Sequence, residues 1–527
     1  MSPQARPVPA GFSPYVWAST AEEVAARRGL SPVQIVRFDA NVPPLPGVPQ
    51  VPLGESFARL NEYPEGSYRA LREAAAAYAG VEPDWIVPDA GADGVIALVA
   101  RTFLGPGRQA AVPAAPAYPL YRIASAIEGA EAVSEPEGAS VVWVCNPDNP
   151  TGALREPEEI AALARANPDA VVAVDEAYWE YWGKTVVPLI AETPNLVAIR
   201  TLSKAFGFAA LRVGYAVASP DVARELERRR GPAPIATPCA AIAAAALAAP
   251  RLDVEQTVAE RGRMRAALLA AGFDCPESHA NFVFLPLEDA AATADRLEEQ
   301  GLVVRLYPRG IRITVRLPAE NDAVLAALGA AAPPAKVRSA LLVRTTAETA
   351  LRVSLALDGQ GRARVDTGIG FLDHLLTLLA FHGGLDLELL ASGDLGVDEH
   401  HTVEDVLASL GDAVAQALDG RAGVARYGSA TVPMDEARAT AAVDLVRRPH
   451  AEIELKFRGD RVGGLAPTLL PHALERFAHQ AGLTLHVEGS GEDDHHVAEA
   501  AFKALGRALR EACAPTGATV ASTKGAL

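Results

Sequence analysis

The sequence contains two copies of one short motif, in which two adjacent histidines are followed, after two further residues, by a glutamate. The six side chains are His400, His401 and Glu404 in the first copy and His495, His496 and Glu499 in the second. In a helix, the first histidine and the glutamate of each copy stand at positions i and i+4 and share one face. Imidazole nitrogens and carboxylate oxygens together suit divalent Mn, Zn or Fe. The repeated motif therefore predicts a duplicated metal site.

The distribution of the other histidines indicates that the chemistry of the chain changes partway along. Ten of the eleven histidines lie between His374 and His496, and only His279 precedes them. A single histidine is most often a hydrogen-bonded core or surface residue. Adjacent pairs that repeat with the same offset to a glutamate favour metal ligation instead. We therefore expect the metal chemistry in the part of the chain that begins near His374.

Length, charge and apolar patterning limit the possible classes of protein. The chain has 527 residues, too many for one hydrophobic core, and we expect two to four domains. Its formal net charge of −17 argues against a general polyanion binder, so we expect no nucleic-acid partner. Met1–Pro14 lacks the apolar core of a signal peptide, no apolar stretch is long enough to cross a bilayer, and the four cysteines are scattered. These features predict a cytoplasmic protein without a membrane partner.

The clearest predicted domain boundary is a double proline, Pro333-Pro334, at the end of a helical pattern rich in alanine and leucine. We place the junction near residue 335, between domains 1–335 and 336–527. Before it, short apolar runs alternate with longer helical patterns. The runs span residues 141–145, 171–174, 196–199 and 213–218. Such runs are typical of strands buried on both faces of a parallel sheet in an α/β fold.

The residues that follow these runs carry candidate chemistry, because ligands of open α/β sheets bind beyond the carboxyl ends of the strands. Asn149 follows the first run, Asp175 the second and Lys204 the third. Only six of the 48 basic residues are lysines, and the first 335 residues contain only Lys184 and Lys204. Since arginine cannot form a Schiff base, a lysine at a strand end is a candidate for covalent amine chemistry. Lys184 fits a solvated surface position better.

In their order along the chain, these motifs resemble fold-type I pyridoxal-phosphate aminotransferases, and most closely the histidinol-phosphate aminotransferase family. The resemblance covers residues 13–328. The segments that carry it are Asn61-Glu62-Tyr63-Pro64, Pro116-Ala117-Tyr118, Asn149-Pro150-Thr151-Gly152, Val174-Asp175-Glu176-Ala177-Tyr178, Ser203-Lys204-Ala205-Phe206-Gly207, Leu211-Arg212-Val213-Gly214-Tyr215 and Ile311-Arg312-Ile313-Thr314. It implies a mostly parallel sheet with helices on both faces, a bound pyridoxal 5'-phosphate and a dimer with shared sites.

The same resemblance implies a role for each matching residue. Lys204 should bind the cofactor covalently and move a proton, and Asp175 should keep the pyridine nitrogen protonated. Arg312 should bind a substrate carboxylate through its forked guanidinium, and Asn41 should lie in the substrate pocket. The other implied cofactor contacts are Ala92, Asp93, Tyr118, Asn149, Tyr178, Ser203, Arg212 and, from the other subunit of the dimer, Tyr63.

Several positions depart from the usual pattern of histidinol-phosphate aminotransferases, although Lys204 and Asp175 do not. The phosphate loop at residues 89–94 reads Asp-Ala-Gly-Ala-Asp-Gly where the family usually has Gly-Asn-Gly-Ser-Asp-Glu. Arg316 stands where a glycine is common. These departures leave open an aminotransferase for another amino acid, such as an aromatic one, or a phosphothreonine-type decarboxylase.

Residues 338–527 resemble imidazoleglycerol-phosphate dehydratases from end to end. Beside the doubled histidine motif, the matching segments are Arg344-Thr345-Thr346-Ala347-Glu348-Thr349, Thr367-Gly368-Ile369-Gly370-Phe371-Leu372-Asp373-His374, Pro433-Met434-Asp435-Glu436 and Ser522-Thr523-Lys524-Gly525. This resemblance implies an α+β domain with an internal repeat of two halves, each a small sheet backed by two helices. It also implies two Mn(II) ions per site, with ligands drawn from neighbouring subunits.

Residue matching gives eight candidate metal ligands, four in each half. They are His374, His400, His401 and Glu404 in the first half and His472, His495, His496 and Glu499 in the second. Glu348 is the candidate for proton transfer near the substrate's imidazole ring. The candidate phosphate contacts are Arg426, Arg448, Lys503, Ser522 and Lys524. His382, on the same helical face as His374, is a candidate to line the pocket.

The two resemblances explain each other, because the ketone that the dehydratase would make is the one that the aminotransferase would take. We expect a bifunctional enzyme of histidine biosynthesis that dehydrates imidazoleglycerol phosphate to imidazole-acetol phosphate and transaminates this ketone with glutamate to histidinol phosphate. The alternative left open is a C-terminal half that binds metal and forms an assembly without catalysis. The two families imply a large homo-oligomer with a 24-subunit dehydratase core and aminotransferase dimers.

Overall fold

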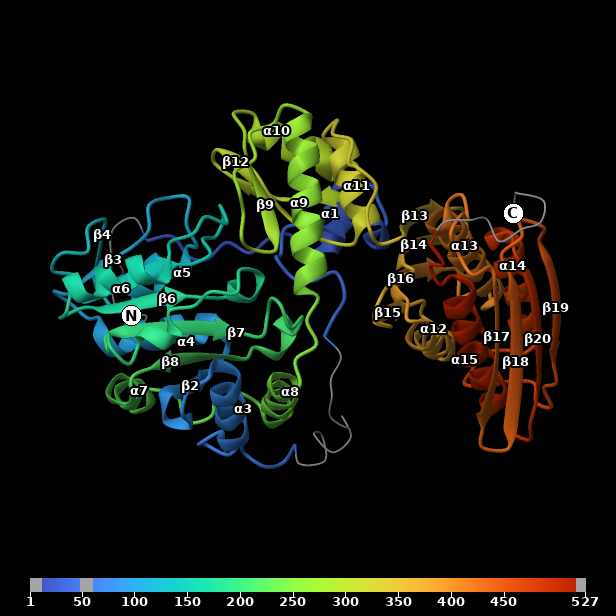
Figure 1. Cartoon of the computed structure of the whole chain (residues 1–527), viewed down its shortest axis with the longest axis horizontal. Coiled ribbons are helices and arrows are strands. Elements are labelled where there is room, and N and C mark those ends of the chain that lie inside the picture. The colour runs from blue at the N-terminus through green and yellow to red at the C-terminus, as the bar shows by residue number, and fades with distance from the viewer. Residues whose placement is uncertain (1–11, 48–59, 518–527) are drawn as a thin grey trace, which may run out of the picture.

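The computed structural model describes residues 12–47 and 60–517, which form lobes at the two ends of an elongated molecule and a smaller lobe between them (Figure 1). A seven-stranded sheet forms the centre of one end lobe, and two four-stranded sheets lie in the other. The smaller lobe includes helix α1 (Ala21–Arg28). Within the described ranges, no helix is long and apolar enough to span a membrane.

The seven-stranded sheet has the order β2-β8-β7-β6-β5-β3-β4, and β8 is antiparallel to both of its neighbours, whereas β7, β6, β5, β3 and β4 run parallel. The strands are β2 (Ile86–Asp89), β3 (Gln109–Ala111), β4 (Glu131–Val133), β5 (Val141–Cys145), β6 (Val171–Asp175), β7 (Leu196–Thr201) and β8 (Gly214–Ala218). The apolar runs predicted as strands are therefore β5 to β8. The expected mostly parallel sheet is confirmed.

Both faces of this sheet are covered by helices, which explains why its strands are almost wholly apolar. Val142 and Val144 of β5 pack on one side with α3, α6 and α8, whereas Val141 and Trp143 pack on the other with α4, α5 and α7. The helices are α3 (Arg69–Ala79), α4 (Gly91–Phe103), α5 (Leu120–Ile127), α6 (Pro157–Ala166), α7 (Pro220–Glu227) and α8 (Thr237–Ala248). Successive side chains of a strand point to opposite faces, so a strand between two helical layers needs apolar residues at every position.

The middle lobe combines the beginning of the described chain with the segment after α8. Strand β12 lies between β11 and β9 in an antiparallel sheet, and β1 pairs with β10. The elements are η1 (Pro32–Gln34), β1 (Val36–Arg37), α9 (Val254–Ala270), β9 (Phe282–Pro286), α10 (Ala290–Glu299), β10 (Leu302–Val303), β11 (Arg305–Tyr307), β12 (Gly310–Thr314) and α11 (Pro318–Ala327). The lobe therefore places residues from near the N-terminus beside β12, which carries Arg312.

The C-terminal lobe contains two sheets with the same strand arrangement. Their orders are β13-β14-β16-β15 and β17-β18-β20-β19, and in each the last pair is parallel. The first half comprises β13 (Ser339–Thr345), β14 (Thr349–Ala356), β15 (Ala363–Asp366), α12 (Gly370–Gly383), β16 (Asp386–Gly393) and α13 (His400–Leu418). The second comprises β17 (Tyr427–Met434), β18 (Ala437–Asp444), β19 (His450–Leu455), α14 (Leu469–Ala481), β20 (Thr484–Ser490) and α15 (Asp494–Ala512). Each half thus supplies a sheet and two helices.

The four helices lie between the two sheets and share one apolar core with them (Figure 1). Helix α12 packs against α15, and α13 packs against α14, so each helix of one half meets a helix of the other. Glycines allow close approach at both contacts. A Cβ on Gly506 of α15 would lie 2.6 Å from the Leu379 carbonyl oxygen, and one on Gly411 of α13 would lie 2.5 Å from the Phe477 carbonyl oxygen. This helix pairing decides which histidines meet.

Candidate active sites

Lys204 lies just after β7, where the parallel strands end. Its Nζ is 3.5 Å from the Ala40 carbonyl oxygen and 5.7 Å from the centre of the Tyr178 ring. Burial, reinforced by the positive charge of Arg312, lowers the pKa of Lys204 to about 8. About a tenth of the amine is therefore neutral at pH 7, far more than for an ordinary lysine, and a neutral amine is the form that attacks a carbonyl carbon.

Asp175 is the last residue of β6 and is almost fully buried. Its Oδ2 accepts a hydrogen bond of 2.7 Å from the Tyr121 hydroxyl, and its Oδ1 accepts one of 3.1 Å from the Ala177 amide. Burial raises the pKa of Asp175 to about 6, and the hydrogen bond from Tyr121 limits the rise. Sequence reasoning missed Tyr121, which lies three residues after the quoted Tyr118 and belongs to α5.

The N-terminus of α4 forms a cradle for an anion. The helix starts at Gly91, and the preceding residue, Ala90, offers no side chain to cap the free amides of Ala92 and Asp93. Gly214 permits close packing here, because a Cβ on it would lie 2.7 Å from the Ala92 nitrogen. Backbone amides at a helix N-terminus suit a phosphate group.

Charged and hydroxyl side chains surround this cradle. Arg212 NH2 and the Tyr118 hydroxyl each donate a hydrogen bond of 2.8 Å to the Asp93 carboxylate. Ser203 lies on the loop after β7 and is hydrogen-bonded to Thr201 through the two hydroxyls, 2.9 Å apart. The structure thus brings the predicted phosphate contacts to the same strand ends as Lys204.

Arg312, the predicted contact for a substrate carboxylate, is buried on β12. Its NH1 donates to Asn149 Oδ1 at 2.5 Å and to the Tyr307 hydroxyl at 3.1 Å, and its NH2 donates to the Asp39 carbonyl oxygen at 2.7 Å. Tyr307 and Asp39 were not predicted, and no sequence motif pointed to them.

Asn41 and Tyr178 form a second contact beside Arg312, in which Asn41 Nδ2 donates to the Tyr178 hydroxyl at 2.9 Å. Tyr63 lies away from this contact. Tyr63 is 94% exposed and has no contact with the Lys204 pocket among the described residues. This exposed position is compatible with the expected reach of Tyr63 toward another subunit.

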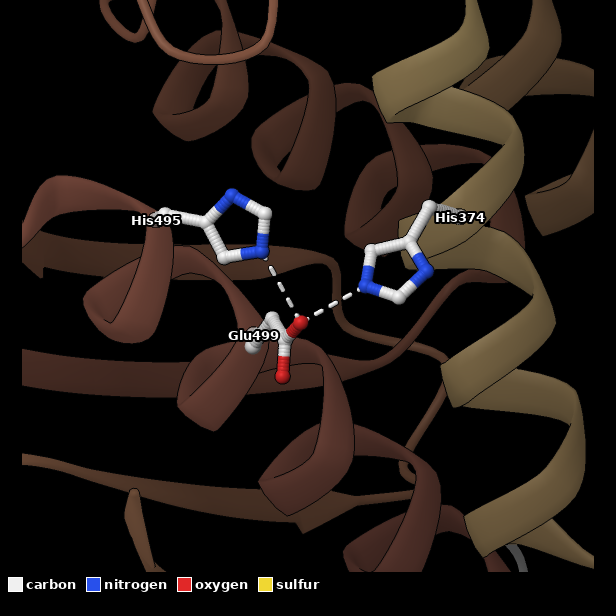
Figure 2. Close-up of side chains that lie close together, drawn as sticks. All are labelled: His374, His495 and Glu499. Atoms are coloured by element: carbon white, nitrogen blue, oxygen red, sulfur yellow. Dashed lines mark hydrogen bonds and ion pairs between the residues drawn. The ribbon is translucent and has the colours of Figure 1, made fainter. Parts of the chain in front are cut away.

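The first histidine cluster consists of His374, His495 and Glu499 (Figure 2). His374 Nε2 lies 2.6 Å and His495 Nε2 lies 3.0 Å from Glu499 Oε1, and both rings point toward this oxygen. Burial opposes ionisation of Glu499, but hydrogen bonds from Lys503, His374 and His495 lower its pKa to about 2. The cluster therefore offers two imidazole nitrogens and an ionised carboxylate, a donor set that fits a divalent transition metal.

The second histidine cluster consists of His400, Glu404 and His472. Glu404 Oε2 lies 3.4 Å from His400 Nε2 and 3.3 Å from His472 Nε2, and the two rings stack with centres 5.6 Å apart. It repeats the composition of the first cluster. The two clusters support the interpretation of the doubled motif as two metal sites in each chain.

The two clusters combine ligands from both halves of the C-terminal part. Each half supplies four candidate ligands, and residue matching leaves open which of them share an ion. Each cluster takes one histidine from the opposite half, because α12 packs on α15 and α13 packs on α14. His401 and His496 lie outside both clusters, since each stands one position, about 100°, further around its helix. Their Nδ1 atoms lie 3.0 Å from Asp394 Oδ2 and 2.9 Å from Glu436 Oε2 respectively.

Glu348 lies close to one of these outward histidines. It occupies the turn between β13 and β14, is exposed, and its Oε1 lies 3.8 Å from His401 Nε2. Asp435 occupies the equivalent turn in the second half, with Oδ2 3.9 Å from His496 Nε2. Of the two carboxylates that contact the outward histidines, Glu436 belongs to a motif quoted from the sequence. Asp394 was not predicted.

Among the described residues, the predicted phosphate contacts Lys503 and Arg426 do not converge within one chain. Lys503 Nζ lies 2.6 Å from Glu499 Oε2 and 3.2 Å from Met434 Sδ, at the end of β17. Arg426 precedes β17, at its other end, and pairs with Asp444 at 2.7 Å. Eight residues of strand extend over roughly 25 Å, so Arg426 and Lys503 cannot bind one phosphate in the same chain.

The remaining predicted residues of the C-terminal part divide into three cases. Arg448 is exposed in the turn before β19. His382 is half-buried at the end of α12, where burial and the charge of Lys503 lower its pKa. Ser522 and Lys524 lie outside the described residues.

Fold and sites define an enzyme made of two catalytic parts, an aminotransferase followed by a dehydratase. The sequence model of the family "Aminotransferase class I and II" matches residues 127–328, and that of "Imidazoleglycerol-phosphate dehydratase" matches residues 367–509. The imidazoleglycerol-phosphate dehydratase of Magnetococcus marinus is 50% identical over 188 residues, which are 35% of this chain and 95% of that protein. Through its C-terminal part, the chain belongs to the imidazoleglycerol-phosphate dehydratase family.

Two further similarities each cover only a part of the chain. The histidine biosynthesis bifunctional protein HisB of Stenotrophomonas maltophilia is 47% identical over 190 residues, which are 36% of this chain and 53% of that protein. The crystal structure of histidinol-phosphate aminotransferase from Sinorhizobium meliloti, in complex with pyridoxal-5'-phosphate, has a TM-score of 0.54 and 25% identity. The matched region covers 60% of this chain and 96% of the Sinorhizobium meliloti chain. The chain is therefore a bifunctional enzyme with a dehydratase part and an aminotransferase part.

Proposed function

We propose that the two parts catalyse consecutive steps of histidine biosynthesis. The C-terminal part dehydrates imidazoleglycerol phosphate to imidazole-acetol phosphate, and the N-terminal part transaminates this ketone with glutamate to histidinol phosphate. One observation carries the proposal: a chain with two histidine-carboxylate clusters also holds a lysine amine, with a pKa of about 8, beside a buried aspartate. The first kind of site suits an imidazole substrate, and the second suits transamination.

In the aminotransferase part, we assign pyridoxal 5'-phosphate to the pocket around Lys204. When bound, this group supplies an electron sink for the carbanion of the amino acid. Asp175 holds a proton on the ring nitrogen, the α4 amides with Ser203 and Arg212 bind the phosphate, and Lys204 Nζ takes and returns the proton at the substrate Cα. The other assigned cofactor contacts are Asn149, Tyr178, Tyr118 and, from a second subunit, Tyr63.

The substrate side of this pocket is formed by Arg312 and Asn41. Arg312 presents a guanidinium that suits a substrate carboxylate, once its hydrogen bond to Asn149 is exchanged. Asn41 orients the Tyr178 hydroxyl through the contact between the two side chains. These residues bind and orient the glutamate.

In the dehydratase part, we assign one Mn(II) ion to each histidine cluster. Bound Mn(II) acts as a Lewis acid that favours the deprotonated form of the substrate's imidazole ring. The histidine and glutamate side chains of each cluster would hold the ion, and Glu348 would move a proton near the substrate's ring. The donor atoms of each cluster all lie within 4.8 Å of one another, which supports the assignment.

We further propose that the dehydratase site is shared between subunits. His401 and His496 face away from the clusters of their own chain, and Arg426 lies a strand length away from Lys503. In an oligomer, His401 and His496 of one copy could complete the clusters of its neighbours. Neighbouring copies could likewise bring together the phosphate contacts, which include Arg448, Ser522 and Lys524. A homo-oligomer with a 24-subunit dehydratase core and aminotransferase dimers would meet this need.

The two proposed functions correspond to two domains of the chain. We propose an aminotransferase domain at residues 1–335 and a dehydratase domain at residues 336–527. We also propose that the second domain is a duplication, because its two sheets share one strand order and each half supplies two helices.

Two variants test the proposed function. With imidazoleglycerol phosphate, glutamate, Mn(II) and pyridoxal phosphate present, Lys204→Ala should accumulate the ketone, and His400→Ala should leave the first substrate unchanged. A Lys204→Ala enzyme that still forms histidinol phosphate would contradict the aminotransferase assignment. Ketone formation by the wild type followed by transamination of only a different amino acid would support the alternative substrate for the N-terminal part.

A further inference from the structure

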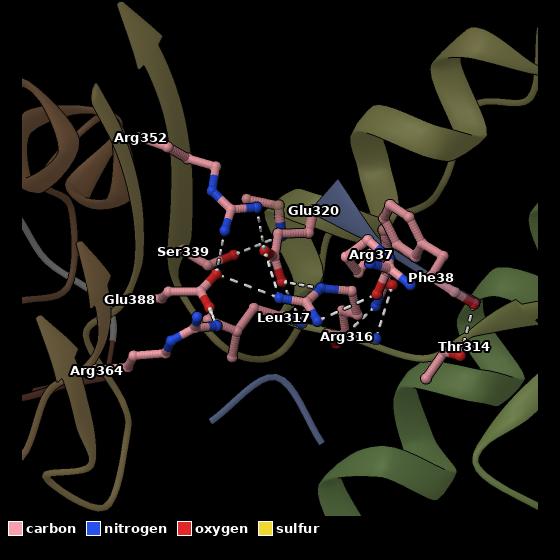
Figure 3. Close-up of polar contacts among 12 residues, drawn as sticks. Arg37, Phe38, Thr314, Arg316, Leu317, Glu320, Ser339, Arg352, Arg364 and Glu388 are labelled. Carbon is pink, nitrogen blue, oxygen red and sulfur yellow. Dashed lines mark hydrogen bonds and ion pairs between the residues drawn. The ribbon is translucent and has the colours of Figure 1, made fainter. Parts of the chain in front are cut away.

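A buried network of charges joins the dehydratase part to the aminotransferase part (Figure 3). Glu388 on β16 is buried, and its Oε2 lies 2.8 Å from Arg352 NH2 and 3.3 Å from Arg316 NH2. Arg316, just after β12, is itself buried and bound through two nitrogens, each 3.0 Å from an oxygen of Glu320. A carboxylate of the dehydratase sheet therefore compensates a buried guanidinium of the aminotransferase part.

The outer face of the first dehydratase sheet explains how this network forms. Glu388 stands beside Ser354 and Arg364 across the strands, all on one face, whereas Leu387 and Leu389 on the other face belong to the apolar core. The aminotransferase elements η1 and α11 pack against this sheet. Around Glu388 and Ser354, which are both buried, the polar face is thus covered by the aminotransferase part.

A short path of hydrogen bonds leads from Arg316 to the substrate pocket. Arg316 NH1 donates to the Arg37 carbonyl oxygen at 3.3 Å, which fixes the end of β1. The next residues carry the pocket contacts: the Asp39 oxygen accepts from Arg312, and the Ala40 oxygen lies beside Lys204 Nζ. Segment 37–41 therefore lies between the charge network and the reacting groups.

Thr314, on the same strand as Arg312, holds this segment at two further points. Its hydroxyl lies 2.6 Å from the Phe38 carbonyl oxygen and 3.1 Å from the Asn41 amide nitrogen. Asn41 in turn bonds Tyr178. Segment 37–41 is therefore held by Arg316 at its first residue and by Thr314 at Phe38 and Asn41.

We propose that Glu388 of the dehydratase part is a positioning residue for the aminotransferase pocket: it fixes Arg316, and Arg316 fixes segment 37–41 around Arg312 and Lys204. The inference rests on the proposed aminotransferase function and adds a dependence of one active site on the other domain. Removal of the Glu388 charge loosens Arg316 and with it the Asp39 contact of Arg312. The substrate carboxylate then binds less well, whereas the phosphate cradle at the N-terminus of α4 is untouched.

The test compares Glu388→Gln with Arg364→Gln in the full-length, cofactor-loaded enzyme. Arg364 contacts the same carboxylate at 2.9 Å through Oε1, but its side chain is 57% exposed and does not contact Arg316. We expect Glu388→Gln to raise the KM for glutamate about 2- to 30-fold, the range for coupling through a contact network, and to leave kcat within about twofold. Arg364→Gln should leave KM unchanged, and both variants should keep dehydratase activity and pyridoxal phosphate uptake.

A second variant covers the case in which Glu388→Gln does not fold. Arg316→Lys keeps the buried charge balance but loses the forked contacts with Glu320 and Arg37, and it should raise the KM for glutamate in the same way. If the wild type is active and the folded variants keep its KM for glutamate, the inference about Glu388 is overturned, but the proposed function is not. A wild type that transaminates no substrate overturns the proposed function together with it.

Discussion

His374 Nε2 lies 2.6 Å from Glu499 Oε1, although the two residues are 125 positions apart and belong to opposite halves of the dehydratase part. The contact exists because α12 packs on α15, and Gly506 permits the close approach. The equivalent pair, His472 and Glu404, depends in the same way on Gly411 between α13 and α14. Metal binding in this domain is therefore a property of helix packing between the halves.

Gly506→Ala should weaken Mn(II) binding at the His374 cluster. The added methyl group would lie 2.6 Å from the Leu379 carbonyl oxygen, so the helices must move apart, at a cost of about 1–3 kcal/mol. Calorimetric titration with Mn(II) should show one of the two ions bound at least about tenfold more weakly. Gly411→Ala should do the same for the His400 cluster. Gly420→Ala, which meets nothing within 4 Å, is the matched control, and equal affinities in all three variants would refute the packing argument.

Metal removal should reduce the size of the assembly. His401 and His496 lie outside the clusters of their own chain, and we propose that they complete sites with neighbouring copies. Chelation followed by light scattering should give a smaller particle, and added Mn(II) should restore the large one. The double variant His401→Ala/His496→Ala should remain small with metal present. A particle of constant mass under all these conditions is inconsistent with shared ligands.

The rate of cofactor uptake should depend on pH through Lys204. Because burial and Arg312 lower its pKa from 10.5 to about 8, the charged amine dominates below pH 8 and the neutral amine above it. Uptake of pyridoxal phosphate by the cofactor-free enzyme, followed by absorbance, should rise about tenfold per pH unit below pH 8 and level off above it. Arg312→Gln should move the rise to higher pH. A wild-type rise that continues to about pH 10, the usual lysine value, would exclude the lowered pKa.

Tyr121→Phe should weaken cofactor binding without a change at Lys204. The Tyr121 hydroxyl donates to Asp175 Oδ2, so its loss raises the pKa of Asp175 further, and less carboxylate is available near neutral pH. We expect pyridoxal phosphate affinity to fall about tenfold, since a hydrogen bond to a charged group contributes about 1.5–3 kcal/mol. The defect should shrink as pH rises. Tyr78→Phe, in α3, is the control and should bind normally.

The sequence predicted the large sheet well and the arrangement of the metal ligands only in part. Strands such as 141–145 are apolar at every position because they are buried on both faces, and this pattern is local. The pairing of His374 with Glu499 depends on how distant helices pack, which no local pattern encodes. For the same reason, the side chain of Tyr121 and the backbone oxygen of Asp39 were found only in the structure.

The role of Arg316 shows what a departure from a family pattern indicates. An arginine where a glycine is common looked like a weakness in the resemblance, and the sequence offered no partner for it. The structure places it against Glu388, 72 positions later, in a separate sheet. A buried charge needs a compensating charge, but only the three-dimensional contact identifies which one.

The most direct test of the central claim follows nitrogen through both reactions in one vessel. The purified chain, with Mn(II) and pyridoxal phosphate, is given imidazoleglycerol phosphate and glutamate labelled with heavy nitrogen, and the products are analysed by mass spectrometry. We predict histidinol phosphate that carries the label, formed only when both metal and cofactor are present. Ketone that accumulates without a labelled amine, or an imidazoleglycerol phosphate that is not consumed, would contradict the account.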